Sequence, residues 1–371
     1  MGKLGVFAVD CDGHVFEQDW IWEKYMVGPI RELRPRTVLD NRGLKRTMLE
    51  GRLYPTPEGP GVGNFGGLDN VCSRPGGYDP HERLKDMDAD GLDIHVLFPG
   101  IAMGFQGIRN VELAKAVCQA YNDWLYDFTL ANPERLKGIA VVPLQDPQAA
   151  ALEARRMVKK GFVGIMVGPW VGQEAKQLDH PDHYPFWAEV QELGVPVCPH
   201  AATAFNLPYP GLNWFVTNFQ THMISHSFAQ MMAATSLVAG GIVERFPRLK
   251  ILFCEAGCGW YPYWIDRMDE HYENMPEDQL NGLKMKPSEY FERQCWVTCE
   301  PEEEMIGVVA KLVGDDKVMM ATDYPHWDMQ EEKHYRRLLN REDIPRATRE
   351  KVMGLNAAKL FGLSAPKQKN G

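Results

Sequence analysis

The sequence of 371 residues contains no uninterrupted apolar run near the ~20 residues that a membrane-spanning helix needs. Basic residues are also outnumbered, because 40 Lys and Arg face 50 Asp and Glu and leave a net charge of −10. Binding to a nucleic acid requires a basic surface that neutralises the phosphates. We therefore expect neither a membrane nor a nucleic acid as a partner.

Cysteine is scarce, with eight residues scattered along the chain. The pairs at 254/258 and 295/299 are spaced C-x3-C rather than as the C-x2-C knuckles of structural zinc sites, which favours reduced, buried thiols. The apolar stretch at the start of the sequence is closed by Asp10 and Asp12 before it reaches the length of a signal peptide. We therefore expect a cytoplasmic location.

Strand-like and helix-like segments alternate along the chain. Eight short apolar runs read as strands buried on both faces: 6–11, 93–98, 138–143, 164–167, 195–200, 250–254, 295–298 and 318–322. Helical patterns lie between them at 111–131, 146–160, 185–193, 220–246 and 302–313. The alternation predicts an α/β fold, a single (β/α)8 TIM barrel over residues 1–363. An open doubly wound sheet is the alternative, but no G-x-G-x-x-G motif follows an early strand.

One segment does not fit a barrel unit. Residues 34–80, which follow the first strand, are rich in Gly and Pro around 55–77. We expect an irregular insertion that serves as a lid or an interface, because long irregular connections of this kind are usually functional. The polar tail at 364–371 is expected to be frayed.

The strand ends carry an unusual density of residues that bind metals. In a (β/α)8 barrel, reactive side chains project from the C-terminal ends of the strands, and here those ends lead into Asp12, His14, His200, Glu255 and Asp323. Asp12 and His14 are two residues apart, so both point to the same face of an extended segment. Unpaired charges crowded there would cost several kcal/mol, whereas one divalent cation satisfies them together. Two imidazoles with two or three of these carboxylates therefore predict one bound divalent ion, with Zn2+ ahead of Mn2+ and Fe2+.

The remaining histidines divide into three cases. His222 and His226 lie four residues apart on one helix face, as in an H-x3-H zinc site, but the Glu of an H-E-x-x-H motif is missing. A polar role for His226 at the pocket mouth competes with plain packing. His326 follows the eighth-strand aspartate and is a candidate for facing the substrate, whereas His95 lies inside a strand and is expected in the core.

Neighbouring residues suggest support for the site. Asp10 and Glu17 flank the first ligand pair and are expected to orient it. Trp170, Phe205 and Trp214 follow the fourth and fifth strands, where loops would line a pocket. Such aromatics favour a ring-bearing substrate, with loop packing as the alternative.

Three longer motifs connect these residues to a known family: Asn-Pro-Glu-Arg-Leu at 132–136, Gly-Gly-Ile-Val-Glu-Arg-Phe-Pro-Arg-Leu-Lys at 240–250 and Ala-Thr-Asp-Tyr-Pro-His at 321–326. With them the chain resembles the amidohydrolase superfamily, in the branch that holds aminocarboxymuconate-semialdehyde decarboxylase, γ-resorcylate decarboxylase and related metal-dependent hydrolases. The resemblance implies that Asp12, His14, His200 and Asp323 bind the metal, that Asp323 also handles a proton, and that the protein is a homodimer acting on a small molecule.

The sixth-strand position departs from the family pattern. Family members commonly carry His there, whereas this chain places Glu255 in Phe-Cys-Glu-Ala-Gly-Cys-Gly at 253–259. The departure favours hydrolysis of an amide, lactone or similar carbonyl bond by a metal-activated water, with Asp323 as the base. The alternative is non-oxidative decarboxylation of an aromatic or enol-type carboxylic acid, with the proton supplied by Glu255 or Asp323. A non-catalytic metal- or ligand-binding barrel is a third hypothesis. The candidate catalytic residues are Asp323, Glu255, His226 and His326.

Overall fold

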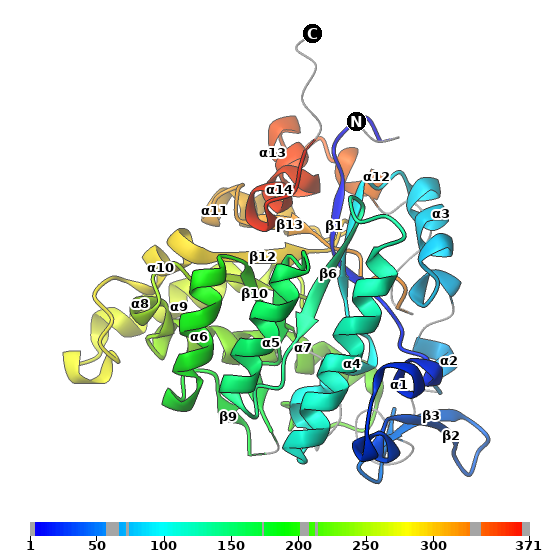
Figure 1. Ribbon diagram of the computed structural model, residues 1–371. Coiled ribbons are helices and arrows are strands. Elements are labelled where there is room, and N and C mark those ends of the chain that lie inside the picture. Colours follow the sequence, from blue (N-terminus) through cyan, green and yellow to red (C-terminus); the bar gives the residue numbers. More distant parts are fainter. Residues whose placement is uncertain are drawn as a thin grey trace.

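A computed structural model describes residues 4–56, 67–71, 74–172, 174–200, 208–211, 214–326 and 335–365 (Figure 1). All eight runs expected to be strands form strands: β1 Val9–His14, β5 Ile94–Phe98, β6 Leu136–Val141, β7 Gly164–Val167, β10 Pro196–Pro199, β11 Lys250–Phe253, β12 Cys295–Cys299 and β13 Val318–Met320. They pair in parallel in the order β1-β5-β6-β7-β10-β11-β12-β13. The predicted (β/α)8 TIM barrel is confirmed.

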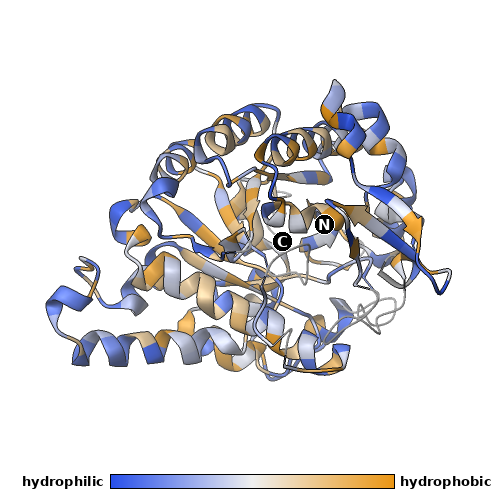
Figure 2. Ribbon diagram, turned by 90° about the horizontal axis from the view of Figure 1, so that it is seen from below, coloured by the Kyte–Doolittle hydropathy of each residue, from blue (hydrophilic) through white to orange (hydrophobic). Residues whose placement is uncertain are grey.

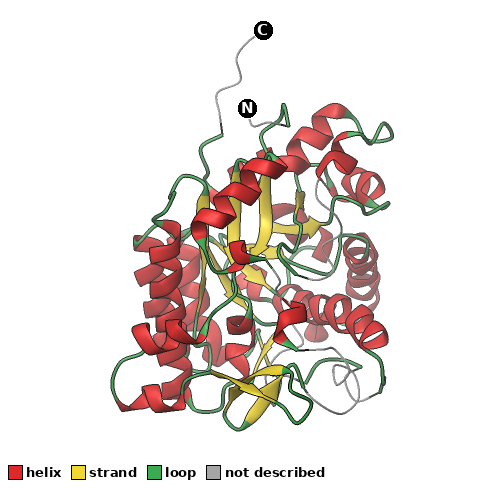
Figure 3. Ribbon diagram, turned by 90° about the vertical axis from the view of Figure 1, so that its right-hand side faces the viewer, coloured by secondary structure: helices red, strands yellow, loops and turns green. Residues whose placement is uncertain are grey.

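Helices surround these strands (Figure 3). Those described are α1 Asp19–Tyr25, α2 Leu68–Val71, α3 Pro80–Asp90, α4 Val111–Thr129, α5 Pro147–Lys159, α6 Tyr184–Leu193, α7 Asn218–Ala234, α8 Ile242–Arg245, α9 Trp260–Asn274, α10 Pro287–Gln294, α11 Ile306–Val313, α12 Tyr335–Leu339, α13 Arg346–Glu350 and α14 Asn356–Phe361. Within the described ranges, no helix combines the length and the apolarity that crossing a membrane requires.

The helix predicted over 220–246 is divided in the structure. After α7 the chain makes a π-helical turn over Thr235–Ala239, and α8 starts only at Ile242. Gly241 causes the break: its φ is +83°, and a Cβ there would lie 2.8 Å from the backbone oxygen of Asn281. Only glycine tolerates both conditions at low cost.

The apolar strands fill two layers of core. One lies between the strands and the helices, and the other fills the barrel interior, where Val9, Val96, Ile139, Leu252 and Met319 meet. Figure 2 shows apolar residues gathered on the central strands, with hydrophilic ones towards the outside. The seven described cysteines are free and buried, as expected.

Part of the insertion is more regular than predicted. Residues 34–80 contain a three-stranded antiparallel sheet, β2 Arg36–Leu39, β3 Lys45–Leu49 and β4 Arg52–Tyr54. Glu50 and Gly51 both have positive φ, at +49° and +76°, as a tight hairpin turn between β3 and β4 requires. Residues 57–66, where Gly and Pro are dense, lie outside the described residues, as do residues 72–73 and positions 366–371 of the tail.

The first and last barrel strands are tied together at the end that carries the predicted site. The backbone N–H of Asp323 donates to the Asp12 carbonyl at 3.0 Å, and that of His14 donates to the Tyr324 carbonyl at 2.5 Å. The buried carboxylate of Asp10 accepts from the backbone N–H of Thr322 at 3.1 Å and also from its hydroxyl. Barrel closure and the position of the metal-type residues therefore depend on the same bonds.

The Thr322 hydroxyl offers a test of this closure. Thr322→Val leaves a carboxylate oxygen of buried Asp10 without its donor, so we expect the free energy of unfolding to fall by about 1–3 kcal/mol. Denaturant unfolding monitored by circular dichroism measures the loss. Thr348→Val is the matched control, because Thr348 donates at 3.0 Å to Asp315 in a part-buried setting. Equal losses in the two variants would show that the closure bond has no special weight.

Candidate active site

Four side chains from distant parts of the sequence meet at the C-terminal end of the barrel. Asp12 and His14 end β1, His200 follows β10 in a bridge with Cys254, and Asp323 follows β13. His14 Nε2 lies 3.3 Å from Asp12 Oδ1 and 3.0 Å from Asp323 Oδ1, and His200 Nε2 lies 3.1 Å from Asp12 Oδ1. All four are buried. The structure thus brings together the whole predicted ligand set.

The atoms of this group fit a shared cation. His14 Nδ1 donates to the Pro99 carbonyl at 2.6 Å, which turns Nε2 towards two carboxylates. His14 Nε2 and Asp323 Oδ1 are buried and face each other at 3.0 Å, but neither takes part in a well-aligned hydrogen bond. Burial lowers the pKa of His14, but Asp12 and Asp323 outweigh it and raise that pKa well above its ordinary value. Because a single proton bridges only one nitrogen–oxygen pair, one divalent ion suits the group better.

Glu255 lies beside this group and connects it to α7. Its Oε2 is 3.2 Å from His200 Nδ1, and its Oε1 is 3.4 Å from His226 Nε2. A carboxylate behind a ligating imidazole fixes the orientation of that imidazole. The backbone N–H of Glu255 donates to Thr298 Oγ1 at 3.2 Å, which holds the turn after β11.

His226 brings an imidazole to the sixth strand end from outside the barrel. Its Nδ1 donates to the His222 carbonyl within α7 at 3.0 Å, so Nε2 faces Glu255. Burial opposes the charge on His226, but Glu255 raises its pKa to about 9. His222 is the opposite case, because burial and the neighbouring His226 lower its pKa to about 4. Of the two, His226 is the one that carries a proton at neutral pH.

His326 also lies in the site. Its Nδ1 is 2.8 Å from Asp323 Oδ1, and its ring stacks on that of His14 with centroids 4.3 Å apart. Burial would raise the pKa of Asp323, but His326 and His14 hold it well below the ordinary value. Asp323 and Glu255 both have left-handed backbone, with φ of +59° and +50°. Such conformations cost about 1–3 kcal/mol each and concentrate at functional sites.

Among the described residues, the side chains of the site form three groups of metal-ligand type, of which the first two share His14. Within each group the atoms lie within 4.8 Å of one another: Asp12–His14–His200, His14–Asp323–His326 and His222–His226–Glu255.

The residues expected to support the site do so through backbone hydrogen bonds. Asp10 accepts from the Asp12 N–H at 3.1 Å. Burial raises the pKa of Glu17 to about 7, and its carboxyl accepts from the backbone N–H groups of Gly100, Ile101 and Ala102. His95 is buried, as predicted, and accepts from Arg83 at 3.0 Å.

The aromatic residues give less support to a ring-binding pocket. Trp170 is buried and packs against Tyr209, with ring centroids 5.1 Å apart, whereas Trp214 is exposed. Phe205 lies outside the described residues.

Glu300 is a site residue that the sequence reasoning missed. It follows β12, and with Asp12, Glu255 and Asp323 it lines a cavity of about 10 Å³, room for roughly one water molecule. The residue is exposed at its outer side, but desolvation of its carboxyl at the cavity, with the charge of Asp323 next in weight, raises the pKa of Glu300. The strand-end rule would have found it, since Glu300 directly follows the seventh barrel strand.

A family model described as amidohydrolase matches residues 9–363. The chain belongs to the amidohydrolase family. Among curated proteins, this amidohydrolase is 31% identical to γ-resorcylate decarboxylase of Rhodococcus jostii, over 76% of this chain and 87% of that protein. It is 27% identical to 2-amino-3-carboxymuconate-6-semialdehyde decarboxylase of Dictyostelium discoideum, over 97% of this chain and 92% of the relative.

Solved structures share the fold of this amidohydrolase. An amidohydrolase from Mycobacterium avium subsp. paratuberculosis superimposes with a TM-score of 0.80 at 20% identity, covering 97% of this chain and all of the other. A dihydroxybenzoic acid decarboxylase from Polaromonas, with bound manganese and the inhibitor 2-nitroresorcinol, gives a TM-score of 0.69 at 21% identity, covering 99% of this chain and all of the other.

The expectation of amide or lactone hydrolysis is wrong. It was based on Glu255 replacing the sixth-strand histidine, yet the curated relatives named above, which match across most of the chain, are decarboxylases. The structure supplies a physical reason: His226 on α7 places its Nε2 3.4 Å from Glu255 Oε1, next to the sixth strand end. The substitution on the strand therefore does not remove imidazole chemistry from the site.

Metal analysis tests the predicted ligand group. Elemental analysis of the purified protein is expected to find one divalent ion per chain, and His200→Ala and Asp323→Ala should each weaken binding more than the ~10–100-fold typical of residues behind the ligands. His271→Ala, on the exposed part of α9, is the control and should retain the ion. Full metal content in either site variant would remove that residue from the ligand set.

Proposed function

We propose that this member of the amidohydrolase family is a metal-dependent, non-oxidative decarboxylase of an aromatic or enol-type carboxylic acid. The observation that carries the proposal is the Glu255–His226 pair, which sets a protonated imidazole beside the buried ligand group. The similarity to curated decarboxylases supports the reaction class. In this reaction the bond to the carboxyl carbon breaks, CO2 leaves, and a proton takes its place on the substrate carbon, so no oxidant is needed.

The proposed ion is Mn2+, although Zn2+ was favoured on sequence grounds. The ion would be held by Asp12, His14, His200 and Asp323. Carboxylate oxygens are suitable ligands for Mn2+, and imidazoles are suitable ligands for Zn2+. Manganese in the related Polaromonas decarboxylase supports this choice. When bound, such an ion polarises substrate oxygens and stabilises negative charge that develops on them.

Residues of the chain would then hold the proton and deliver it to the substrate carbon. Burial would raise the pKa of Glu255, but the charge of His226 prevails and lowers it, so Glu255 stays a carboxylate. The proton therefore stays on His226 Nε2. Asp323 is held as a carboxylate by His326 and His14, which suits a ligand better than a proton donor. We therefore assign proton delivery to His226, positioned by Glu255, in place of the Glu255 or Asp323 expected from sequence.

The reaction class can be tested directly. Incubation with carboxyl-labelled hydroxybenzoic acids, 2,6-dihydroxybenzoate among them, is expected to release labelled CO2 and leave the corresponding phenol. Asp323→Asn, which retains the shape of the side chain but loses its charge, should abolish release. Absence of CO2 across aromatic and enol-type acids, from protein that contains its metal, would contradict decarboxylation.

The pH profile tests the proton donor. An acid acts in its protonated form, so activity should be retained below pH 9 and fall as pH rises through about 9, the pKa of His226. His226→Gln should lower kcat by about 10²–10⁴-fold and remove that alkaline limb.

His222→Gln is the matched control on the same helix. His222 is neutral at pH 7, so this variant should keep both the limb and the metal. An unchanged alkaline limb in His226→Gln would transfer the role to another acid, Glu300 first.

A further inference from the structure

One of the three metal-ligand groups among the described residues is separate from the ion predicted at the strand ends. His222, His226 and Glu255 offer two imidazoles and a carboxylate, and their ligand atoms lie within 4.8 Å of one another. None of the three is among the four predicted ligands of that ion. The site therefore contains a second ligand set, which the predicted ion leaves unused.

Helix α7 places its two histidines on one face. His222 and His226 are four residues apart, and the centroids of their rings are 4.1 Å apart. Two histidines at this spacing bind zinc in the H-E-x-x-H motif, where the Glu is the general base rather than a ligand. The absence of that Glu, which counts against a metalloprotease, removes no metal ligand from α7.

Glu255 supplies the third ligand from the sixth barrel strand. His226 Nδ1 donates to the His222 carbonyl at 3.0 Å, so Nε2 faces Glu255 Oε1 at 3.4 Å. Ligand atoms at about 2.1 Å from a tetrahedral zinc ion lie roughly 3.4 Å from one another. A charge-assisted hydrogen bond is shorter, at about 2.7–2.9 Å. The separation of the two atoms therefore fits two ligands of one ion.

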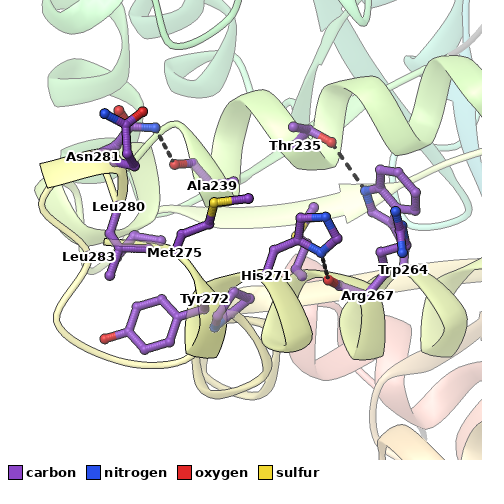
Figure 4. A pocket seen from close by; sticks show the side chains of 13 residues that line it. Thr235, Ala239, Trp264, Arg267, His271, Tyr272, Met275, Leu280, Asn281 and Leu283 are labelled. Carbon is purple, nitrogen blue, oxygen red and sulfur yellow. Dashed lines mark hydrogen bonds between the residues drawn. The ribbon is translucent and has the colours of Figure 1, made fainter. Parts of the chain in front are cut away.

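Both ends of α7 are anchored, so the two imidazoles are held in position before any ion binds. At the start of the helix, the Thr217 hydroxyl accepts from the Gln220 N–H at 3.3 Å. After its end, the indole of Trp264 on α9 donates to Thr235 at 3.2 Å (Figure 4). Side chains that are positioned in advance lose less conformational entropy on binding.

The charge of the site leaves room for a second cation. Four carboxylates line the small cavity at the strand ends: Asp12, Glu255, Glu300 and Asp323. The predicted ion takes two of them as ligands, and Glu255 and Glu300 are outside its ligand set. Residues 193–243, which include α7, contain no Lys or Arg. The described positive groups that face Glu255 are the imidazoles of His200 and His226, and an imidazole gives up its proton when it binds a metal.

Two imidazoles and one carboxylate favour Zn2+ over Mn2+. The same set of two His and one Glu holds the ion in several zinc enzymes, with a fourth position open to water. Imidazole-rich sites bind Zn2+ more tightly than Mn2+, whereas carboxylate-rich sites suit Mn2+. Because this set has three protein ligands and the predicted ion has four, we expect the second site to fill only when zinc is added.

We propose that His222, His226 and Glu255 form a second metal site, which binds Zn2+ and thereby stops turnover. The ion takes the electron pair of His226 Nε2, and the proton held there is released to water. Zinc binding rests on the geometry of the three ligands alone. The loss of turnover rests in addition on the proposed function, in which the same nitrogen delivers the proton.

Counting bound ions tests the zinc site without any substrate. Protein that holds its first ion is dialysed against ZnCl2, and the sum of all divalent ions is measured, because exchange at the first site does not change that sum. Wild type is expected to bind two ions per chain. His222→Gln should bind one, because removal of a ligand raises the dissociation constant of the second ion more than ~100-fold.

His271→Gln is the matched control. His271 Nδ1 also donates to the carbonyl four residues earlier in a helix, that of Arg267, at 2.9 Å (Figure 4). His271 belongs to none of the metal-ligand groups in the described part of the chain, so this variant should bind two ions. One ion in wild type, two in His222→Gln, or loss of the second ion in His271→Gln would overturn the site. Far-UV circular dichroism verifies folding, and His226→Gln should also bind a single ion.

Turnover of the protein loaded with Mn2+ tests the effect of the second ion. Release of CO2 should fall as zinc fills the second site, with the same midpoint as binding, and that midpoint should rise more than ~100-fold in His222→Gln. Full turnover with both ions bound, or a loss that accompanies release of Mn2+, would contradict the effect on turnover. If wild type decarboxylates no acid, the proposed function fails, and the ion count still decides whether the zinc site exists.

Discussion

Buried carboxylates and imidazoles at the end of the barrel need a shared positive charge, and much of the structure follows from that need. Asp12, His14, His200 and Asp323 approach one another at 3.0–3.3 Å in the interior, where unpaired charge is costly. The fold tolerates this because β1 and the segment after β13 are joined by backbone hydrogen bonds at the same point. The same backbone hydrogen bonds thus close the barrel and bring the site residues together.

The site also places an imidazole next to the strand end where family members commonly carry a histidine. Glu255 on the sixth strand end cannot act as an imidazole, but its two oxygens face imidazoles on both sides, His200 from β10 and His226 from α7. His226 therefore lies beside this strand end on a helix, and the Glu255 carboxylate connects it to the ligand group. A comparison of the strand-end residues alone shows only that the sixth-strand histidine is missing.

This explains what sequence reasoning could and could not predict. Apolar runs buried on both faces gave all eight strands, and the strand-end rule gave Asp12, His14, His200 and Asp323, because both depend on local pattern and barrel topology. The pairing of His226 with Glu255 depends on the tilt of α7, which no spacing reports. The hairpin in the insertion was missed because Glu50 is a non-glycine residue with positive φ. Glu300 obeys the same strand-end rule, because it directly follows β12, and could have been predicted from the sequence.

Helix α7 connects the chemistry to the outer surface. One side of the helix positions His226 against Glu255, and the large side chains exposed on its outer side, among them Phe219 and Phe228, are apolar. Amphipathicity in a barrel helix normally serves one requirement, burial against the strands. Here two requirements compete: the site demands polar groups on the inner side of α7, so its large apolar residues are left on the outer side.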